Sequence, residues 1–273
     1  MPTPARDLDP GSPLLEFDPS REAVIEPHAS VRPFPVPEAL VVCYFRDAIE
    51  LLCAETGATV VGRLESEMGG IPVHAADWQG ARIGIVQGGV GAPLAVGWLE
   101  ELLAMGVRRV VVVGGAGALV PGLTLGHVVV PTSAVRDEGT SHHYLPASRT
   151  VEPTPTAVEA ITRTLERRGV PYVSGATWTT DAIYRETRAK MERRVAEGCL
   201  TVEMEAAALF ALARFRGIEL GQMLYAGDDL SGESWDHRDW QGHATGRELL
   251  LRLACDALVE MGGDRGAGLT RAE

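Results

Sequence analysis

Two carboxylates stand at the start of a long apolar run, Glu203 and Glu205 within residues 201–210. The pattern predicts a buried helix with Thr201 as its N-cap and Gly217 just beyond its end. Both acids then occupy the first turn, where the helix dipole favours negative charge. This placement has two interpretations: the acids only complement the dipole, or a core helix presents them to a ligand.

A second acidic pair, Asp228 and Asp229, directly follows the apolar residues 220–226, which are predicted to form a strand. Burial and mutual repulsion can raise the pKa of one of two adjacent carboxyl groups, and such a group can act as a general acid. A solvated turn is the alternative interpretation of the same residues.

Glycine loops follow two further predicted strands, at residues 88–92 and 114–119. The first loop precedes a predicted helix, so the amides of Gly89 and Gly91 are candidate anion ligands. Neither loop is a dinucleotide fingerprint, because Leu94 and Val120 stand where the third glycine belongs. Taken singly, each loop also fits a tight strand exit.

The elements around these motifs alternate between apolar, β-branched runs and helical patterns. Strands are predicted at residues 39–45, 59–62, 82–87, 109–113, 127–135, 172–178 and 220–226, and helices at 46–55, 93–105, 157–168, 186–196, 203–216 and 243–261. Such alternation predicts a largely parallel sheet covered by helices on both faces. Ligands of such sheets bind beyond the carboxyl ends of the strands, where the glycine loops and acids converge.

Composition excludes several classes of protein. The net charge of −12, with scattered Lys and Arg, argues against a nucleic-acid-binding surface. The four cysteines have no CxxC spacing and predict buried free thiols, and the histidines lack metal-site spacing. No apolar run is long enough to span a membrane and no signal peptide is recognisable, so a cytoplasmic protein without a metal is expected.

The chain divides into three parts. Residues 1–38 contain nine prolines and predict an extended N-terminal arm. Residues 39–261 form one predicted α/β domain, since 273 residues with 45% hydrophobic content can bury one large core. Residues 262–273, rich in glycine and charge, predict a flexible tail.

Four stretches in this order resemble the purine nucleoside and uridine phosphorylase family: the glycines at 114 and 117, residues 126–141, residues 178–184 and the Glu-Met-Glu-Ala-Ala run at 203–207. The resemblance covers residues 39–258 and implies a three-layer α/β/α sandwich around a mixed sheet. It also implies a homo-oligomer, from a dimer to a hexamer, acting on a nucleoside with inorganic phosphate as co-substrate and with no other cofactor.

The resemblance assigns roles to individual residues. Glu205 would bind the ribose hydroxyls with Met204 against the sugar, and Glu203 would lie beside them. Tyr184 and Gly115 would contact the nucleoside, and Asp228 would protonate the leaving purine, with Arg238 as a candidate to orient it. His28 resembles the histidine that reaches a neighbouring subunit's ribose. These residues suit cleavage of an N-glycosidic bond, whose transition state needs hydrogen bonds to the sugar and an acid for the base.

The phosphate side departs from the family. Arg46, Gly89 and Gly91 are the remaining candidate phosphate ligands, because Val112 stands at the position of the family's strand arginine and Gly115 at that of a hydroxyl residue. Arg63 of a partner is a further candidate, and Thr187 and Ala189 lie where uridine phosphorylases bind uracil. Phosphorolysis is the first hypothesis; a hydrolytic nucleosidase and a non-catalytic nucleoside-binding protein are the alternatives.

Overall fold

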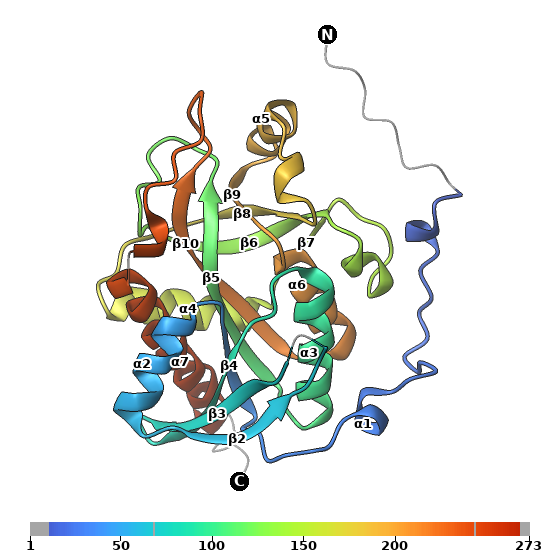
Figure 1. Ribbon diagram of the computed structural model, residues 1–273, viewed down its shortest axis with the longest axis vertical. Helices are drawn as coiled ribbons and strands as arrows, with labels where there is room; N and C mark the ends of the chain where they lie inside the picture. The colour runs from blue at the N-terminus through green and yellow to red at the C-terminus, as the bar shows by residue number, and fades with distance from the viewer. Residues whose placement is uncertain (1–10, 68, 243, 268–273) are drawn as a thin grey trace.

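The computed structural model describes residues 11–67, 69–242 and 244–267 (Figure 1). The strands are β1 (Ala39–Cys43), β2 (Thr59–Leu64), β3 (Ile71–Trp78), β4 (Ala81–Gln87), β5 (Arg109–Ala118), β6 (Val128–Asp137), β7 (Thr150–Val151), β8 (Tyr172–Thr180), β9 (Cys199–Glu203) and β10 (Glu219–Asp229). The helices are α1 (Pro27–Ser30), α2 (Arg46–Thr56), α3 (Ala92–Ala104), α4 (Pro155–Arg167), α5 (Arg188–Ala196), α6 (Ala206–Arg216) and α7 (Ala244–Ala267). Short 3₁₀ turns are η1 (Pro13–Leu15), η2 (Thr140–His143), η3 (Ile183–Arg185) and η4 (Trp240–Gly242).

The ten strands of the described residues join one mixed sheet in the order β10-β6-β8-β9-β5-β1-β4-β3-β2, with β7 beside β6. Strand β10 also pairs with β5, so β5, β10, β6, β8 and β9 close into a ring while β1 to β4 extend from it as an open sheet. The central pairings of β5 with β1 and β10 are parallel, and the β2–β3–β4 meander is antiparallel. The carboxyl ends of β1, β5 and β10 therefore meet at one edge.

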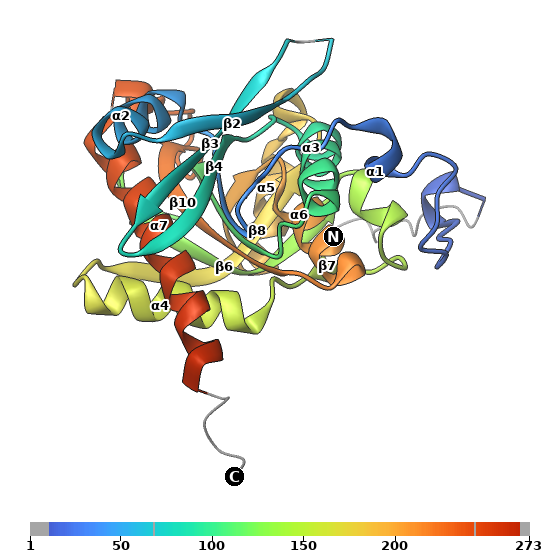
Figure 2. The same cartoon turned by 90° about the horizontal axis from the view of Figure 1, so that it is seen from below.

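Helices cover both faces of the sheet, which confirms the predicted three-layer sandwich. Helices α2, α4 and α7 pack on one face and α3 and α6 on the other, and each face has its own buried apolar cluster (Figures 1 and 2). Helix α6 is buried over its whole circumference from Ala206 to Ala213. None of the described helices is both long and apolar enough to cross a bilayer.

Three strands, β3, β7 and β9, were not predicted, and β7 has only two residues. Strand β3 contains a proline and polar residues that break its apolar pattern. Strand β9 occupies the residues predicted to open the long helix: Thr201 lies in this strand, where its hydroxyl donates to that of Thr177 at 3.0 Å. The prediction of Thr201 as an N-cap is therefore wrong, and α6 begins at Ala206 because pairing with β8 and β5 extends the strand to Glu203. The left-handed Gly217 ends α6 as predicted.

The described part of the arm runs along one side of the molecule, with α1 near α3 and η1 near η2 (Figure 1). Phe34 and Val36 pack against the cluster under α3 and α6. Residues 1–10 fall outside the described residues. At the other end, α7 continues to Ala267, beyond the helix end predicted at Met261, and residues 268–273 are again not described. The four cysteines are free thiols as predicted, but only Cys43, Cys199 and Cys255 are buried, and Cys53 is half-buried.

Asp256 of α7 connects three elements. Its Oδ1 accepts hydrogen bonds from Trp78 Nε1 (2.8 Å) and Gln79 Nε2 (2.6 Å), and its Oδ2 accepts one from Arg168 Nε (2.8 Å). The carboxylate is buried. It therefore joins α7 to the β3–β4 turn and to the end of α4.

We expect Asp256→Ala to lower the free energy of unfolding by about 2–4 kcal/mol, because it leaves these donors without their acceptor. Glu260→Ala, on the same helix, removes ion pairs to Arg163 and Arg167, which are half-exposed, and should cost less than about 1 kcal/mol. Urea denaturation of both variants measures the difference. Equal losses would contradict a special role for the buried carboxylate.

Candidate active site

A cavity of about 590 Å³ opens where β1, β5, β9 and β10 end. Its wall includes Gly114–Gly117 of β5, Val202–Glu205 at the β9–α6 junction, and Gly227 and Asp228 of β10. The volume lies in the range of small-molecule sites, and the place agrees with the rule that ligands bind beyond the strand ends. The predicted residues Tyr184, Glu203, Met204, Glu205, Gly115 and Asp228 all line this cavity.

Glu203 ends β9 and caps α6 from inside the protein. Its Oε2 accepts hydrogen bonds from the backbone amides of Glu205 (2.7 Å) and Ala206 (2.6 Å). Its Oε1 accepts one from the hydroxyl of Thr179 (2.6 Å), which in turn accepts from the amide of Ala207 (2.9 Å). The sequence correctly predicted an acid at the positive end of this helix, but the acid comes from the preceding strand.

Glu205 occupies the N-cap position of α6, and its side chain turns away from the helix amides. Its Oε1 accepts a hydrogen bond from the backbone amide of Gly91 at 2.6 Å. Burial raises the pKa of Glu205 above its ordinary value, and the negative charge of Glu203 raises it further. Burial likewise raises the pKa of Glu203. The two carboxyl groups therefore tend to share one proton near neutral pH.

A second pair of carboxyl groups, Asp228 and Glu186, also lines the cavity. Asp228 Oδ2 accepts a hydrogen bond from Trp235 Nε1 at 2.6 Å. Burial and the charge of Asp228 raise the pKa of Glu186 to about 7. Glu186 can therefore hold a proton beside Asp228 at neutral pH, which a general acid needs.

The predicted partnerships of Asp228 need correction. Asp229 points to Arg238, which forms an ion pair with it and helps to hold its pKa below the ordinary value against the effect of burial. Arg238 therefore does not orient Asp228, because it is paired with the carboxylate of Asp229. The carboxyl group that Asp228 perturbs is Glu186, which is distant in sequence.

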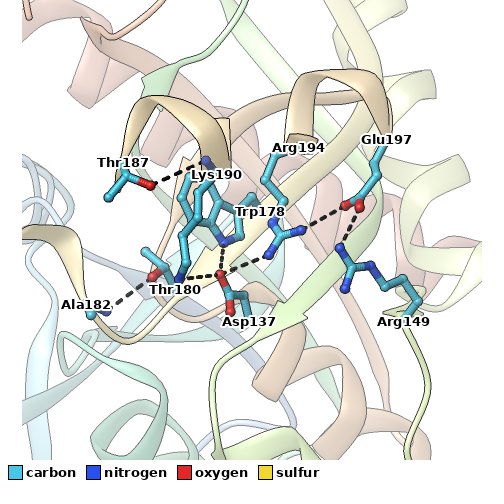
Figure 3. Close-up of polar contacts among 9 residues, drawn as sticks. All are labelled: Asp137, Arg149, Trp178, Thr180, Ala182, Thr187, Lys190, Arg194 and Glu197. Atoms are coloured by element: carbon cyan, nitrogen blue, oxygen red, sulfur yellow. Dashed lines mark hydrogen bonds and ion pairs between the residues drawn. The ribbon is translucent and has the colours of Figure 1, made fainter. Parts of the chain in front are cut away.

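An ionic network holds the segment that carries Tyr184 and Glu186 (Figure 3). Asp137 Oδ2 accepts from Trp178 Nε1 (3.0 Å), Lys190 Nζ (3.2 Å) and Arg194 Nη2 (3.1 Å). Lys190 and Arg194 belong to α5, and Trp178 to β8. The network therefore ties α5 to the sheet and fixes both ends of the loop at the cavity mouth.

The mouth itself is apolar and exposed. Val90, Ile183, Tyr184 and Trp235 line the cavity although 53–95% of each residue's surface is accessible. Tyr184, the most exposed of them, is thus placed to cover a planar group entering the cavity.

The structure does not bring the candidate phosphate ligands together. Arg46 is exposed at the start of α2, does not line the cavity, and donates its Nε to Gln87 at 3.2 Å. Gly89 faces Leu94 and Trp98, and the amide of Gly91 is bound to Glu205. His28 does not line the cavity either, and it is exposed on α1.

Sequence reasoning missed several cavity residues. Arg247 of α7 is the one cationic side chain among the described residues that line the cavity, and it lies over the ring of Phe45 and pairs with Asp47 at 3.0 Å. Glu186, Gln222, Trp235 and Trp240 also line it. Of these residues, only Glu186 could have been singled out from the sequence, because it is an acid at the start of the helix predicted over residues 186–196. The others occupy ordinary positions in helices, strands and turns.

The fold and this cavity define an α/β/α protein with a carboxylate-lined site at the strand ends. The family model of the phosphorylase superfamily matches residues 38–260, so the chain belongs to that superfamily.

Among its relatives, the uridine phosphorylase of Treponema pallidum is 29% identical over 187 residues, covering 64% of this chain and 72% of the relative. The guanosine phosphorylase of Halorubrum lacusprofundi is 31% identical, covering 59% and 69%. The crystal structure of Vibrio fischeri uridine phosphorylase has a TM-score of 0.70 at 25% identity, covering 82% and 93%. The AMP nucleosidase of Bacteroides thetaiotaomicron shares the fold at 22% identity and TM-score 0.70, covering 85% and 91%.

The shared proton of the Glu203–Glu205 pair has a consequence for stability. A carboxyl group with a raised pKa in the folded state destabilises that state once pH exceeds its unfolded value near 4.5. We expect Glu205→Gln to be more stable than the wild type by about 1–3 kcal/mol at pH 8, and the gain to vanish near pH 4. Glu192→Gln, on the exposed surface of α5, is the control. Thermal unfolding at both pH values measures the gain, and a gain independent of pH would contradict this account.

Proposed function

We propose that this chain binds a nucleoside in the cavity and cleaves its N-glycosidic bond. The observation that carries the proposal is the placement of two carboxyl pairs, Glu203–Glu205 and Asp228–Glu186, in one cavity with an apolar mouth. Carboxylates near the sugar favour a transition state with positive charge on the ribose, and a proton at the other end serves the departing base.

The roles follow from position. Glu205, with Met204 beside it, would contact the ribose, and Glu203 would hold Glu205 and the start of α6 in place. Tyr184 and Trp235 at the mouth would sandwich or cover the base, which Gly115 to Gly117 let approach the backbone of β5. The Asp228–Glu186 pair would deliver the proton to the base.

The ribosyl group can be transferred to phosphate (phosphorolysis) or to water (hydrolysis). Phosphorolysis, the first hypothesis from the sequence, is supported by similarity to uridine and guanosine phosphorylases. Burying a phosphate dianion requires cationic or amide donors. Arg46 is outside the cavity, the Gly91 amide is engaged, and Arg247 is already paired with Asp47. The geometry therefore supports hydrolysis better, and phosphorolysis is the second candidate.

Assembly is part of the proposal. His28 is exposed and far from its own cavity, so it would act only in the cavity of a second copy, within a cytoplasmic homo-oligomer.

A panel of purine and pyrimidine nucleosides, each tested with and without phosphate, tests the function. We expect release of free base together with free ribose, at a rate independent of phosphate. Release that requires phosphate and yields ribose 1-phosphate would select the second candidate. Tight binding without turnover would instead indicate a non-catalytic relative.

We expect Asp228→Asn to reduce cleavage of purine nucleosides by about 10²- to 10⁴-fold, because the base then leaves without a proton. A riboside with a p-nitrophenolate leaving group needs no acid and should be cleaved at nearly the parental rate. The ratio of the two kcat/KM values is the measurement. Equal losses on both substrates would show that Asp228 acts in binding or folding.

A further inference from the structure

Gln222 carries a buried amide in the wall of the cavity. Only 1% of the surface of Gln222 is exposed, and its Oε1 atom has no hydrogen-bond partner. A buried acceptor without a donor destabilises the fold, so this oxygen marks a position where a bound molecule can donate a hydrogen bond. Gln222 lines the cavity that contains Glu203 and Glu205.

Tyr44 presents a second such group. Its hydroxyl is buried without a partner, although its ring also lines the cavity. Burial and the charges of Glu205 and Glu203 raise the pKa of Tyr44 well above its ordinary value, so the group is a neutral phenol close to both carboxyl groups. It can donate a hydrogen bond and accept another.

The sheet places the two side chains on one face. Val42 of β1 and Gln222 of β10 both pair with Val112 of β5, so all three side chains point the same way. Tyr44 follows Val42 by two residues and is fixed by its amide, which donates to the carbonyl of Val113 at 3.0 Å. Val112 and Gly114 stand between them on β5, so no polar side chain of that strand separates Tyr44 from Gln222.

The ring of Tyr44 lies between the two glycine loops. A β-carbon on Gly88 would be 2.6 Å from its Cζ, and one on Gly114 would be 3.1 Å from its Cδ2. The ring thus fills the gap in which loop amides would otherwise surround an anion. A ligand in the remaining space must be small, and the adjacent carboxyl groups repel a negative charge.

We propose that Gln222 and Tyr44 hold the water molecule that attacks the ribose. This inference rests on the proposed nucleoside cleavage. The water oxygen forms the bond to C1′, and the C1′–N bond breaks with its electron pair passing to the base. One water proton goes to the carboxylate of the Glu203–Glu205 pair, and the Asp228–Glu186 pair supplies a proton to the base nitrogen.

The test uses Gln222→Leu and Tyr44→Phe, which remove the polar atoms and retain most of the packing. We expect each to lower kcat at least tenfold while the dissociation constant for the nucleoside changes less than threefold, because the water is lost and the sugar contacts remain. Gln222→Leu should also raise the melting temperature, since it removes a buried carbonyl oxygen that has no hydrogen-bond donor. A residue needed only for structure would not combine lower turnover with higher stability.

Matched controls are Gln87→Leu, whose amide binds Arg46 outside the cavity, and Tyr172→Phe, whose hydroxyl bonds Glu166 at the surface. Both should retain parental kcat. Wild-type cleavage that depends on phosphate, with parental kcat in both cavity variants, would overturn the water site while leaving nucleoside cleavage intact. A wild type that cleaves no nucleoside under either condition would overturn both proposals.

Discussion

The carboxylate of Glu203 is the contact on which the site depends. Helix α6 is apolar on every side and buried from its first residue, so its first amides cannot be solvated. Glu203 satisfies the amides of residues 205 and 206, and Thr179 satisfies that of Ala207. A buried charge is tolerated only with such donors, and here three of them surround one carboxylate. Strand β9, strand β8 and helix α6 are thereby joined at a single group.

The position of Glu205 follows from this arrangement. Because Glu203 already occupies the helix amides, the side chain of Glu205 has no partner within α6 and reaches the amide of Gly91. It ends in the cavity wall beside Glu203, where two negative charges cannot both be stable. The resulting pair holds one proton and one charge, which under the proposed function suits an electron-poor ribose and disfavours a second anion.

The sequence predicted the sandwich, most elements and six of the residues that line the cavity, because these depend on local pattern. It failed where distant partners decide. Residues 201–203 have the composition of a helix start, yet two neighbouring strands bind them into β9. Asp229 follows Asp228 in the chain, but Asp229 forms an ion pair with Arg238. The carboxyl group whose pKa Asp228 raises is instead that of Glu186. Gln222 is one polar residue in an apolar strand, and only the closed ring shows that it borders a cavity.

Different parts of the fold hold the two sides of the cavity, the proposed sugar side and the proposed acceptor side. This separation explains how the sugar side can resemble the superfamily while the acceptor side departs from it. The proposed sugar side is fixed by the β9–α6 junction, whose hydrogen bonds satisfy the first amides of α6. The proposed acceptor side is formed by the segment after β1 and the loop after β4, and the amide of Gly91 in that loop binds Glu205. Tyr44 belongs to the acceptor side, whereas the hydrogen bonds that hold Glu203 come from Thr179 and the first amides of α6. The acceptor can therefore change while the nucleoside site and the core remain intact.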